Sequence, residues 1–127
     1  MHQISETICL VYKKLHKEGH VNFPLYRKQR LAIDSVVKTV NANYFGVERF
    51  PTAEDRAVAY LCFIINDHPV TDGNKRLSIL WFEIYCQIND LKPDTSEYGL
   101  DVLAVGIEKT DIEMDQLIQV VKSILFI

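Results

Sequence analysis

The sequence lacks any long apolar run, and its N-terminus lacks the charged-then-apolar pattern of a secretion signal. These two absences predict a protein with neither a membrane span nor an export signal. No repeat, low-complexity tract or linker-like stretch interrupts the 127 residues, so we expect a single domain, residues 1–127. A chain of this length can bury a hydrophobic core.

Charge of one sign and cysteine are also scarce. The formal net charge of −3 gives no broad electrostatic attraction to nucleic acid or to an anionic membrane. We therefore expect neither partner, while a small local anion site stays open. Cys9, Cys62 and Cys86 have no CxxC spacing and stand within apolar segments. This pattern is typical of buried thiols in a reduced, cytoplasmic protein, and not of a redox or metal site.

Helical periodicity dominates what is present. Apolar residues recur at helical spacing in six segments, which begin near Ser5, Leu25, Thr52, Asn74, Leu100 and Thr110. Thr52 with Asp55 and Thr110 with Glu113 have capping-box spacing, and Thr95 or Ser96 is the expected cap of the fifth helix. The segment from Asn74 to Ile88 has almost no polar face, which favours a central position. The predicted fold class is all-α, a compact helical bundle around a central buried helix.

One stretch departs from the helical pattern. Residues 41–50 place aromatic side chains around a glycine, which predicts a short β-hairpin or an aromatic loop. Exposed aromatics there would form a platform for a substrate, and buried ones would fill the core. The sequence leaves these two interpretations open.

A polar insert, His68 to Arg76, separates the two most apolar helices. Pro69 must end the first of them, and the second starts near Asp72 to Asn74. A helix start presents unpaired N–H groups that attract phosphate. Gly73 and Asn74 suit a close approach of backbone to ligand, and Lys75 and Arg76 add two cations that an anion would neutralise.

Two further side chains of the insert suit phosphate transfer. Asp72 offers the hard oxygen that Mg²⁺ prefers, and His68 can accept a proton near neutral pH. Each residue also has an ordinary structural explanation: Asp72 as a helix N-cap, His68 as a core histidine, and the two cations as solvated surface charges. Zinc is disfavoured, because His68 and Asp72 lack further ligands at suitable spacing.

The string HPVTDGNKR resembles the signature of the Fic/Doc family, HxFx(D/E)GN(G/K)R. It looks most like the Doc (death-on-curing) toxins, and the Fic domains of RhuM-type proteins are also similar. The resemblance implies that His68 is the base that deprotonates a target hydroxyl and that Asp72 holds Mg²⁺ on ATP. It also implies that the ATP phosphates are cradled by Gly73, Asn74, Lys75 and Arg76.

Three departures from the family pattern bear on the reaction. Lys75 stands where adenylyltransferases of the family have glycine, and Ile79 stands where they have a second arginine. Both are Doc-like, so the resemblance implies transfer of the ATP γ-phosphate to a hydroxyl of a target protein such as elongation factor Tu. Transfer of AMP is the alternative. Val70 replaces the usual phenylalanine, which leaves open a catalytically degenerate module that binds a nucleotide or a protein.

The resemblance also implies partners and a flap. Family members are often restrained by a helix carrying (S/T)xxxE(G/N), but Lys14 stands four residues before Glu18-Gly19, so no built-in inhibitor is expected. Restraint would come from a separate Phd-like antitoxin that folds on binding. Residues 41–50 fall where we expect the flap that aligns the target peptide by main-chain pairing.

Overall fold

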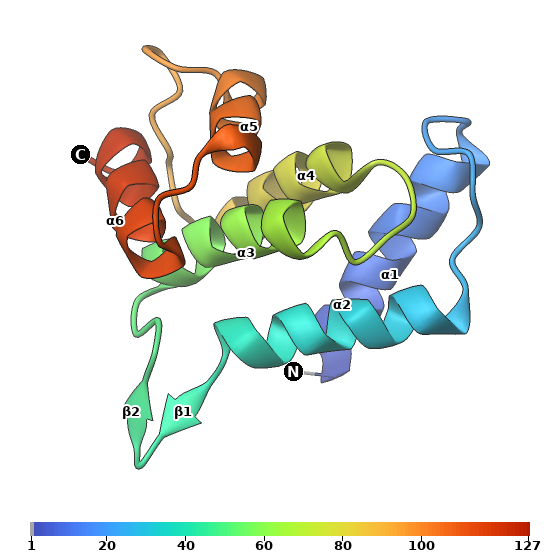
Figure 1. Cartoon of the computed structure of the whole chain (residues 1–127), viewed down its shortest axis with the longest axis horizontal. Coiled ribbons are helices and arrows are strands. Elements are labelled where there is room, and N and C mark those ends of the chain that lie inside the picture. The colour runs from blue at the N-terminus through green and yellow to red at the C-terminus, as the bar shows by residue number, and fades with distance from the viewer. Residues whose placement is uncertain (1) are drawn as a thin grey trace.

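The computed structural model describes residues 2–127 of the chain, and those residues form six helices and one short hairpin (Figure 1). The elements are α1 (His2–Lys17), α2 (Arg27–Val40), β1 (Asn43–Tyr44), β2 (Val47–Glu48), α3 (Ala53–Asp67), α4 (Asn74–Ile88), α5 (Leu100–Lys109) and α6 (Met114–Leu125). The two strands pair antiparallel. The all-α fold class with one small hairpin is therefore confirmed.

Helix α3 forms the centre of the bundle. Nine consecutive residues, Ala57 to Ile65, are buried, and α2, α4, α5 and α6 all pack against this helix. The expectation that the fourth helix is central was wrong, because Ile88 of α4 is 65% exposed and Leu80 is only partly buried. Both helices are rich in apolar residues, and the sequence does not show which of two adjacent helices is enclosed on every side.

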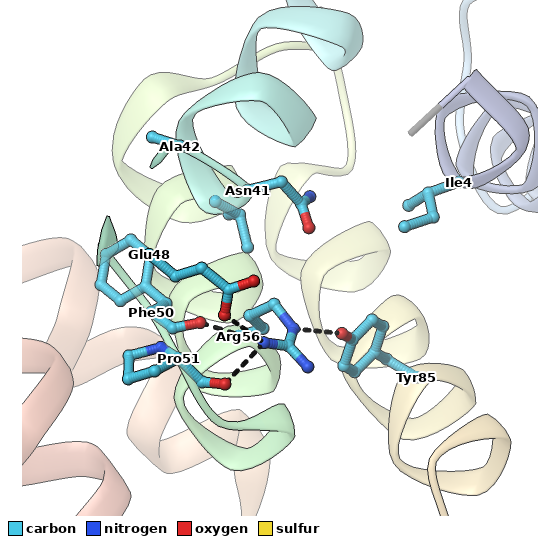
Figure 2. A pocket seen from close by; sticks show the side chains of 9 residues that line it. Ile4, Asn41, Ala42, Glu48, Phe50, Pro51, Arg56 and Tyr85 are labelled. Carbon is cyan, nitrogen blue, oxygen red and sulfur yellow. Dashed lines mark hydrogen bonds and ion pairs between the residues drawn. The ribbon is translucent and has the colours of Figure 1, made fainter. Parts of the chain in front are cut away.

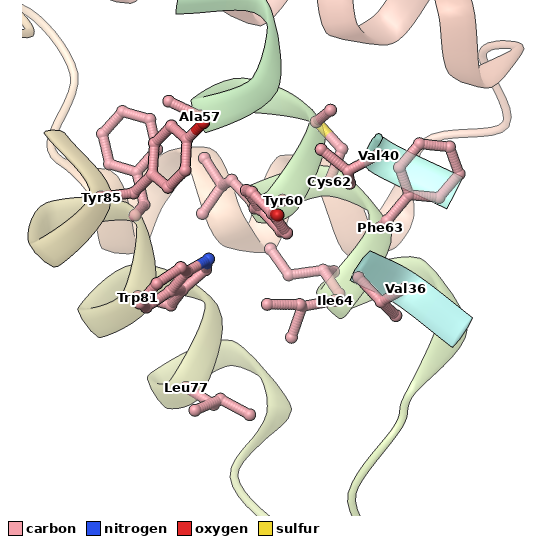
Figure 3. Packing of buried hydrophobic residues seen from close by; sticks show 14 of the residues in the cluster. Val36, Val40, Ala57, Tyr60, Cys62, Phe63, Ile64, Leu77, Trp81 and Tyr85 are labelled. Carbon is pink, nitrogen blue, oxygen red and sulfur yellow. The ribbon is translucent and has the colours of Figure 1, made fainter. Parts of the chain in front are cut away.

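Aromatic side chains lock α3 to α4. The ring of Tyr60 lies 5.7 Å from that of Trp81 and 5.1 Å from that of Tyr85, measured between centroids. Trp81 and Tyr60 are fully buried, and Figure 3 shows the three rings facing one another between the two helices. Each such pair contributes about 0.5–1.5 kcal/mol beyond the area it buries. This packing fixes the two helices that flank the His68–Arg76 insert.

The helix starts differ in how well the sequence predicted them. The capping box of Thr52 and Asp55 is present at α3. The other two expected caps were wrong: Gly99 precedes α5 without a side-chain cap, and Glu113 caps α6. Thr110 instead accepts the N–H of Ile112, which closes a local turn before the helix begins.

The hairpin resolves the open question about its aromatics. Tyr44 and Phe45 at its tip are exposed, whereas Phe50 at its base is buried. The hairpin joins α2 to the N-terminal end of α3, while His68 follows the C-terminal end of α3 (Figure 1). A helix of 15 residues spans about 22 Å, so the hairpin does not lie beside the insert. Its predicted position as a flap over that insert was therefore wrong.

The three cysteines are buried and unpaired by disulfides, as the sequence predicted. Burial raises the pKa of Cys62 to about 12, and burial, with the nearby Glu83 carboxylate, raises that of Cys86 to about 12. Thiols with such pKa values stay protonated and are poor nucleophiles and metal ligands. Among the helices of residues 2–127, none is both long and apolar enough to cross a membrane.

Asp55 is a buried carboxylate at the start of the central helix. Burial alone would raise its pKa, but hydrogen bonds from Lys122 and Thr52 outweigh that effect, and the pKa lies below its ordinary value. The Lys122 Nζ atom lies 2.8 Å from Asp55 Oδ1, so the carboxylate also joins α6 to α3. A carboxylate whose pKa is lowered by folding stabilises the folded state above its unfolded pKa.

We expect Asp55→Asn to lower the free energy of unfolding by about 1–3 kcal/mol at pH 7. The stabilisation is present above the unfolded pKa of about 3.9 and is lost as the pH falls through the lower folded pKa. Urea unfolding of both proteins at pH 7 and pH 3 measures the difference, with the exposed Asp111→Asn as control. A difference that is equal at the two pH values would contradict this role.

Candidate active site

A cleft of about 410 Å³ lies over the start of α4, and all six predicted site residues line it. Its walls come from the α3–α4 loop, from the segment before α2 and from α5; the lining residues are His20, His68, Thr71, Asp72, Gly73, Asn74, Lys75, Arg76 and Glu108. The sequence did not point to His20 or Glu108. They reach the cleft through the fold alone, and no local pattern marks them.

The side chain of Asn74 holds the loop in shape. Its Oδ1 atom accepts the N–H of Val70 at 3.0 Å, and its Nδ2 atom donates to the Val70 carbonyl at 2.8 Å. Both polar groups of the amide are therefore occupied by one residue of the loop, which draws Val70 into the core, where it is 3% exposed. The Asn74 side chain therefore holds the loop and is not available to an anion. The backbone N–H groups at the start of α4 remain available.

The start of α4 is open toward the cleft. Gly73 is the N-cap residue and provides no side-chain cap, so the first N–H groups of a 15-residue helix lack an intrahelical partner. Asp72 is not the N-cap, which removes the ordinary explanation considered for it from the sequence. An uncapped helix start with two cations in its first turn is an anion-binding arrangement.

Gly73 is required for two physical reasons. Its φ of +81° lies in the left-handed region, which costs residues with a side chain about 1–2 kcal/mol. A Cβ at this position would also collide with the Val21 side chain. The loop and the segment before α2 thus approach so closely that only glycine fits between them.

The segment of residues 19–26, between α1 and α2, is the neighbour that packs on the loop. The N–H of Asn22 donates to Asp72 Oδ2 at 2.9 Å, and Arg76 Nη1 donates to the carbonyl of His20 at 3.5 Å. At the start of α2, Gln29 donates to the Thr71 hydroxyl at 3.1 Å. This segment occupies the place beside the α3–α4 loop that was expected for the hairpin.

Asp72 offers the cleft one carboxylate oxygen, Oδ1, because its Oδ2 atom accepts the hydrogen bond from the Asn22 N–H. Among the side chains of residues 3–127, no group of three or more histidine, cysteine or acidic residues could hold a metal ion. A single carboxylate suits Mg²⁺, which takes its other ligands from phosphate and water. It does not suit zinc, which requires three or four protein ligands.

His68 sits at the C-terminal cap of α3 in a left-handed conformation, with φ of 50° and an exposed side chain. Its Nδ1 atom lies 3.4 Å from Asn74 Nδ2, a long contact in which the ring nitrogen must accept. With Nδ1 accepting, the neutral ring carries its proton on Nε2. The loop residue that fixes Val70 therefore also lies beside the imidazole.

The two cations of the first helical turn have different surroundings. Lys75 Nζ lies 3.3 Å from Glu108 Oε1, and both side chains are partly exposed. Arg76 makes no ion pair within the described part of the chain. Arg76 is thus available to an incoming anion at once, whereas Lys75 must first leave Glu108.

Fold and site together give a small helical bundle whose two most buried helices are joined by a loop with an uncapped helix start and two cations. The sequence profile of the Fic/DOC family matches residues 4–86, which is more than half of the chain. The chain belongs to this family. Comparison with curated proteins and with solved structures gave no significant match. The family is one of enzymes that transfer part of a nucleotide to proteins, with ATP as substrate and often with Mg²⁺.

The double constraint on Gly73 can be tested with two glycines of similar φ. Gly19 has φ of +80° with open space around its missing Cβ, whereas Gly73 has both the positive φ and the Val21 side chain. We expect Gly19→Ala to cost about 1–2 kcal/mol of unfolding free energy and Gly73→Ala to cost clearly more.

Adding Val21→Ala separates the two costs. We expect this second change to recover part of the loss caused by Gly73→Ala and to recover nothing in the Gly19→Ala background. Chemical denaturation of six proteins, namely the wild type, Val21→Ala, the two glycine variants and the two double variants, measures the coupling. Equal costs for the two glycine substitutions, with no coupling to Val21, would contradict the close packing.

Proposed function

We propose that this protein is a Doc-like kinase that transfers the γ-phosphate of ATP to a hydroxyl on a target protein. One observation carries the proposal: the uncapped start of α4, Lys75 and Arg76 share a cleft with the imidazole of His68. An anion cradle and a proton acceptor on one side of a cleft are the two parts that phosphoryl transfer needs. Membership of the Fic/Doc family supports the nucleotide as the ligand.

The residues of the helix start would bind the ATP phosphates. The backbone N–H groups of Asn74 and Lys75 face developing negative charge, and the Arg76 guanidinium adds a fork of donors matched to phosphate oxygens. The free oxygen of Asp72 would hold Mg²⁺, which neutralises charge on the phosphates when it is bound. The second oxygen of Asp72 keeps residues 19–26 against the loop.

His68 would act as the general base. The target hydroxyl gives its proton to the imidazole as its oxygen attacks the γ-phosphorus, and the bond from that phosphorus to the bridging oxygen breaks to release ADP. Since Nδ1 accepts the long contact from Asn74, it is the ring nitrogen that carries the lone pair of the neutral ring. Either Nδ1 takes the proton after the ring turns away from this long contact, or Nε2 takes it after a change of tautomer.

The choice of phosphate transfer over AMP transfer rests on two positions. Lys75 adds charge and bulk at the helix start, where AMP-transferring relatives have glycine. Ile79, one turn later, is partly buried against the core, so no cation extends the cradle there. These features support a shorter anion site, filled by the transferred γ-phosphate. AMP transfer is the second candidate, because α4 carries the same helix start in both reactions.

The loop geometry supports an active enzyme over a degenerate binding module. Val70, the small replacement for phenylalanine, is buried, donates its N–H to Asn74 Oδ1 and accepts a hydrogen bond from Asn74 Nδ2. By resemblance to the Doc toxins we propose a translation factor, elongation factor Tu, as target and a Phd-like antitoxin as restraint. Three buried thiols suit a reducing compartment, so we place the reaction in the cytoplasm.

ATP labelled separately at the α and γ positions tests the proposed reaction. Incubated with a cell lysate and Mg²⁺, the wild type should label protein from the γ position alone. His68→Ala should reduce that labelling by about two to four orders of magnitude, because it removes the general base. His16→Ala, at the end of α1 and outside the cleft, is the matched control. Label from the α position would instead identify AMP transfer, and labelling that survives loss of His68 would exclude base catalysis.

Glu108 gives a second test of the cleft, since its carboxylate forms an ion pair with the Lys75 ammonium group. We expect Glu108→Gln to lower the KM for ATP by about two- to fivefold, the range of a partly exposed ion pair together with the loss of one negative charge. Glu97→Gln, exposed and outside the cleft, should leave KM unchanged. A higher KM in Glu108→Gln would show that the glutamate helps to bind the nucleotide.

A further inference from the structure

A second pocket lies at the opposite end of α3 from the cleft. It has a volume of about 390 Å³ and is enclosed by the hairpin, the end of α2, α1 and the first turns of α3 (Figure 2). It shares no residue with the cleft over α4. Its size is that of a small-molecule site.

Arg56 is the fixed charge of this pocket. Its Nε atom donates to the Tyr85 hydroxyl at 3.1 Å, and Nη1 donates to the carbonyls of Phe50 and Pro51 at 3.1 and 3.0 Å. The guanidinium therefore has one orientation, which three acceptors on two elements define. A cation held in place before binding loses little conformational entropy when a ligand arrives.

Several polar groups around Arg56 keep unused hydrogen-bonding capacity. Among the side chains of residues 3–127, Arg56 Nη2 and the Oδ1 atom of Asn41 take part in no hydrogen bond, and the Tyr85 hydroxyl accepts without donating. Figure 2 shows the Asn41 oxygen directed toward the space between Arg56 and Tyr85. The pocket therefore offers two hydrogen-bond donors, one of them on the Arg56 guanidinium, and one acceptor, Asn41 Oδ1.

Glu48 supplies the opposite charge from the hairpin. Its Oε2 atom lies 3.8 Å from Arg56 Nη1, beyond hydrogen-bond distance, and its side chain is 57% exposed. Such a loose pair stabilises little and opens easily. The pocket thus carries one cation and one anion within a few ångströms, and its lining is mostly polar, because Val40 and Phe50 are themselves almost fully buried.

We propose that this pocket binds a free α-amino acid. The ligand's carboxylate would lie on Arg56 Nη2 and the Tyr85 hydroxyl, and its ammonium group would lie between the Glu48 carboxylate and Asn41 Oδ1. Because little apolar surface lines the pocket, the ligand's own side chain would be small. A zwitterion replaces the loose Arg56–Glu48 pair by two closer ones, while a dianion such as phosphate would meet one cation and a repelling glutamate.

Titration of the 127-residue chain with individual α-amino acids, followed by isothermal calorimetry and thermal unfolding, tests the site. We expect a small amino acid, with glycine and L-alanine as first probes, to bind and to raise Tm in proportion to the logarithm of its concentration. The N-acetyl derivative lacks the ammonium group and the amide derivative lacks the carboxylate. Both should bind at least about tenfold more weakly.

Two variants locate the binding. Glu48→Gln, at an exposed position, should weaken binding about tenfold or more, whereas Glu54→Gln on α3, outside the pocket, should not change it. Tyr85→Phe removes a contact to the ligand's carboxylate, so it should weaken binding of the amino acid. The difference in affinity between the N-acetyl derivative, which keeps the carboxylate, and the amide derivative, which lacks it, should become smaller. The proposal is overturned if no amino acid binds, if the blocked derivatives bind equally well, or if Glu48→Gln binds like the wild type. Inorganic phosphate that binds more tightly than every amino acid would also overturn it.

Discussion

The two hydrogen bonds between the Asn74 amide and the backbone of Val70 are the constraint on which the site depends. They close the α3–α4 loop, place Val70 in the core and leave the first N–H groups of α4 without a cap. The same amide contacts the ring of His68. One side chain thus borders both the anion cradle and the proton acceptor, the two parts of the proposed reaction.

Packing by neighbouring parts of the chain also holds the α3–α4 loop in its conformation. Gly73 allows residues 19–26 to approach, and Asp72 accepts a hydrogen bond from that segment. The aromatic contacts of Tyr60 with Trp81 and Tyr85 keep α3 and α4 together. A loop between two well-packed helices loses little further freedom when a nucleotide binds, and such preorganisation favours electrostatic stabilisation.

Much of the loop could be predicted because its residues are contiguous. Pro69, the glycine turn and the two cations follow local rules of helix ends, which act over a few residues. His20 and Glu108 could not be predicted, since they reach the cleft only through packing of distant elements. The hairpin was expected beside the loop and lies at the far end of α3, because its position follows from the length of that helix and not from its own residues.

The central claim is that nucleotide phosphate binds at the start of α4, and an NMR titration tests it most directly. Adding Mg²⁺ with a non-hydrolysable ATP analogue to the isotope-labelled protein should shift the backbone amides of Gly73 to Leu77 most strongly. The amide of Asn22 should follow, because its partner Asp72 lines the cleft. Saturable shifts centred on any other part of the chain, with the start of α4 unchanged, would contradict the account.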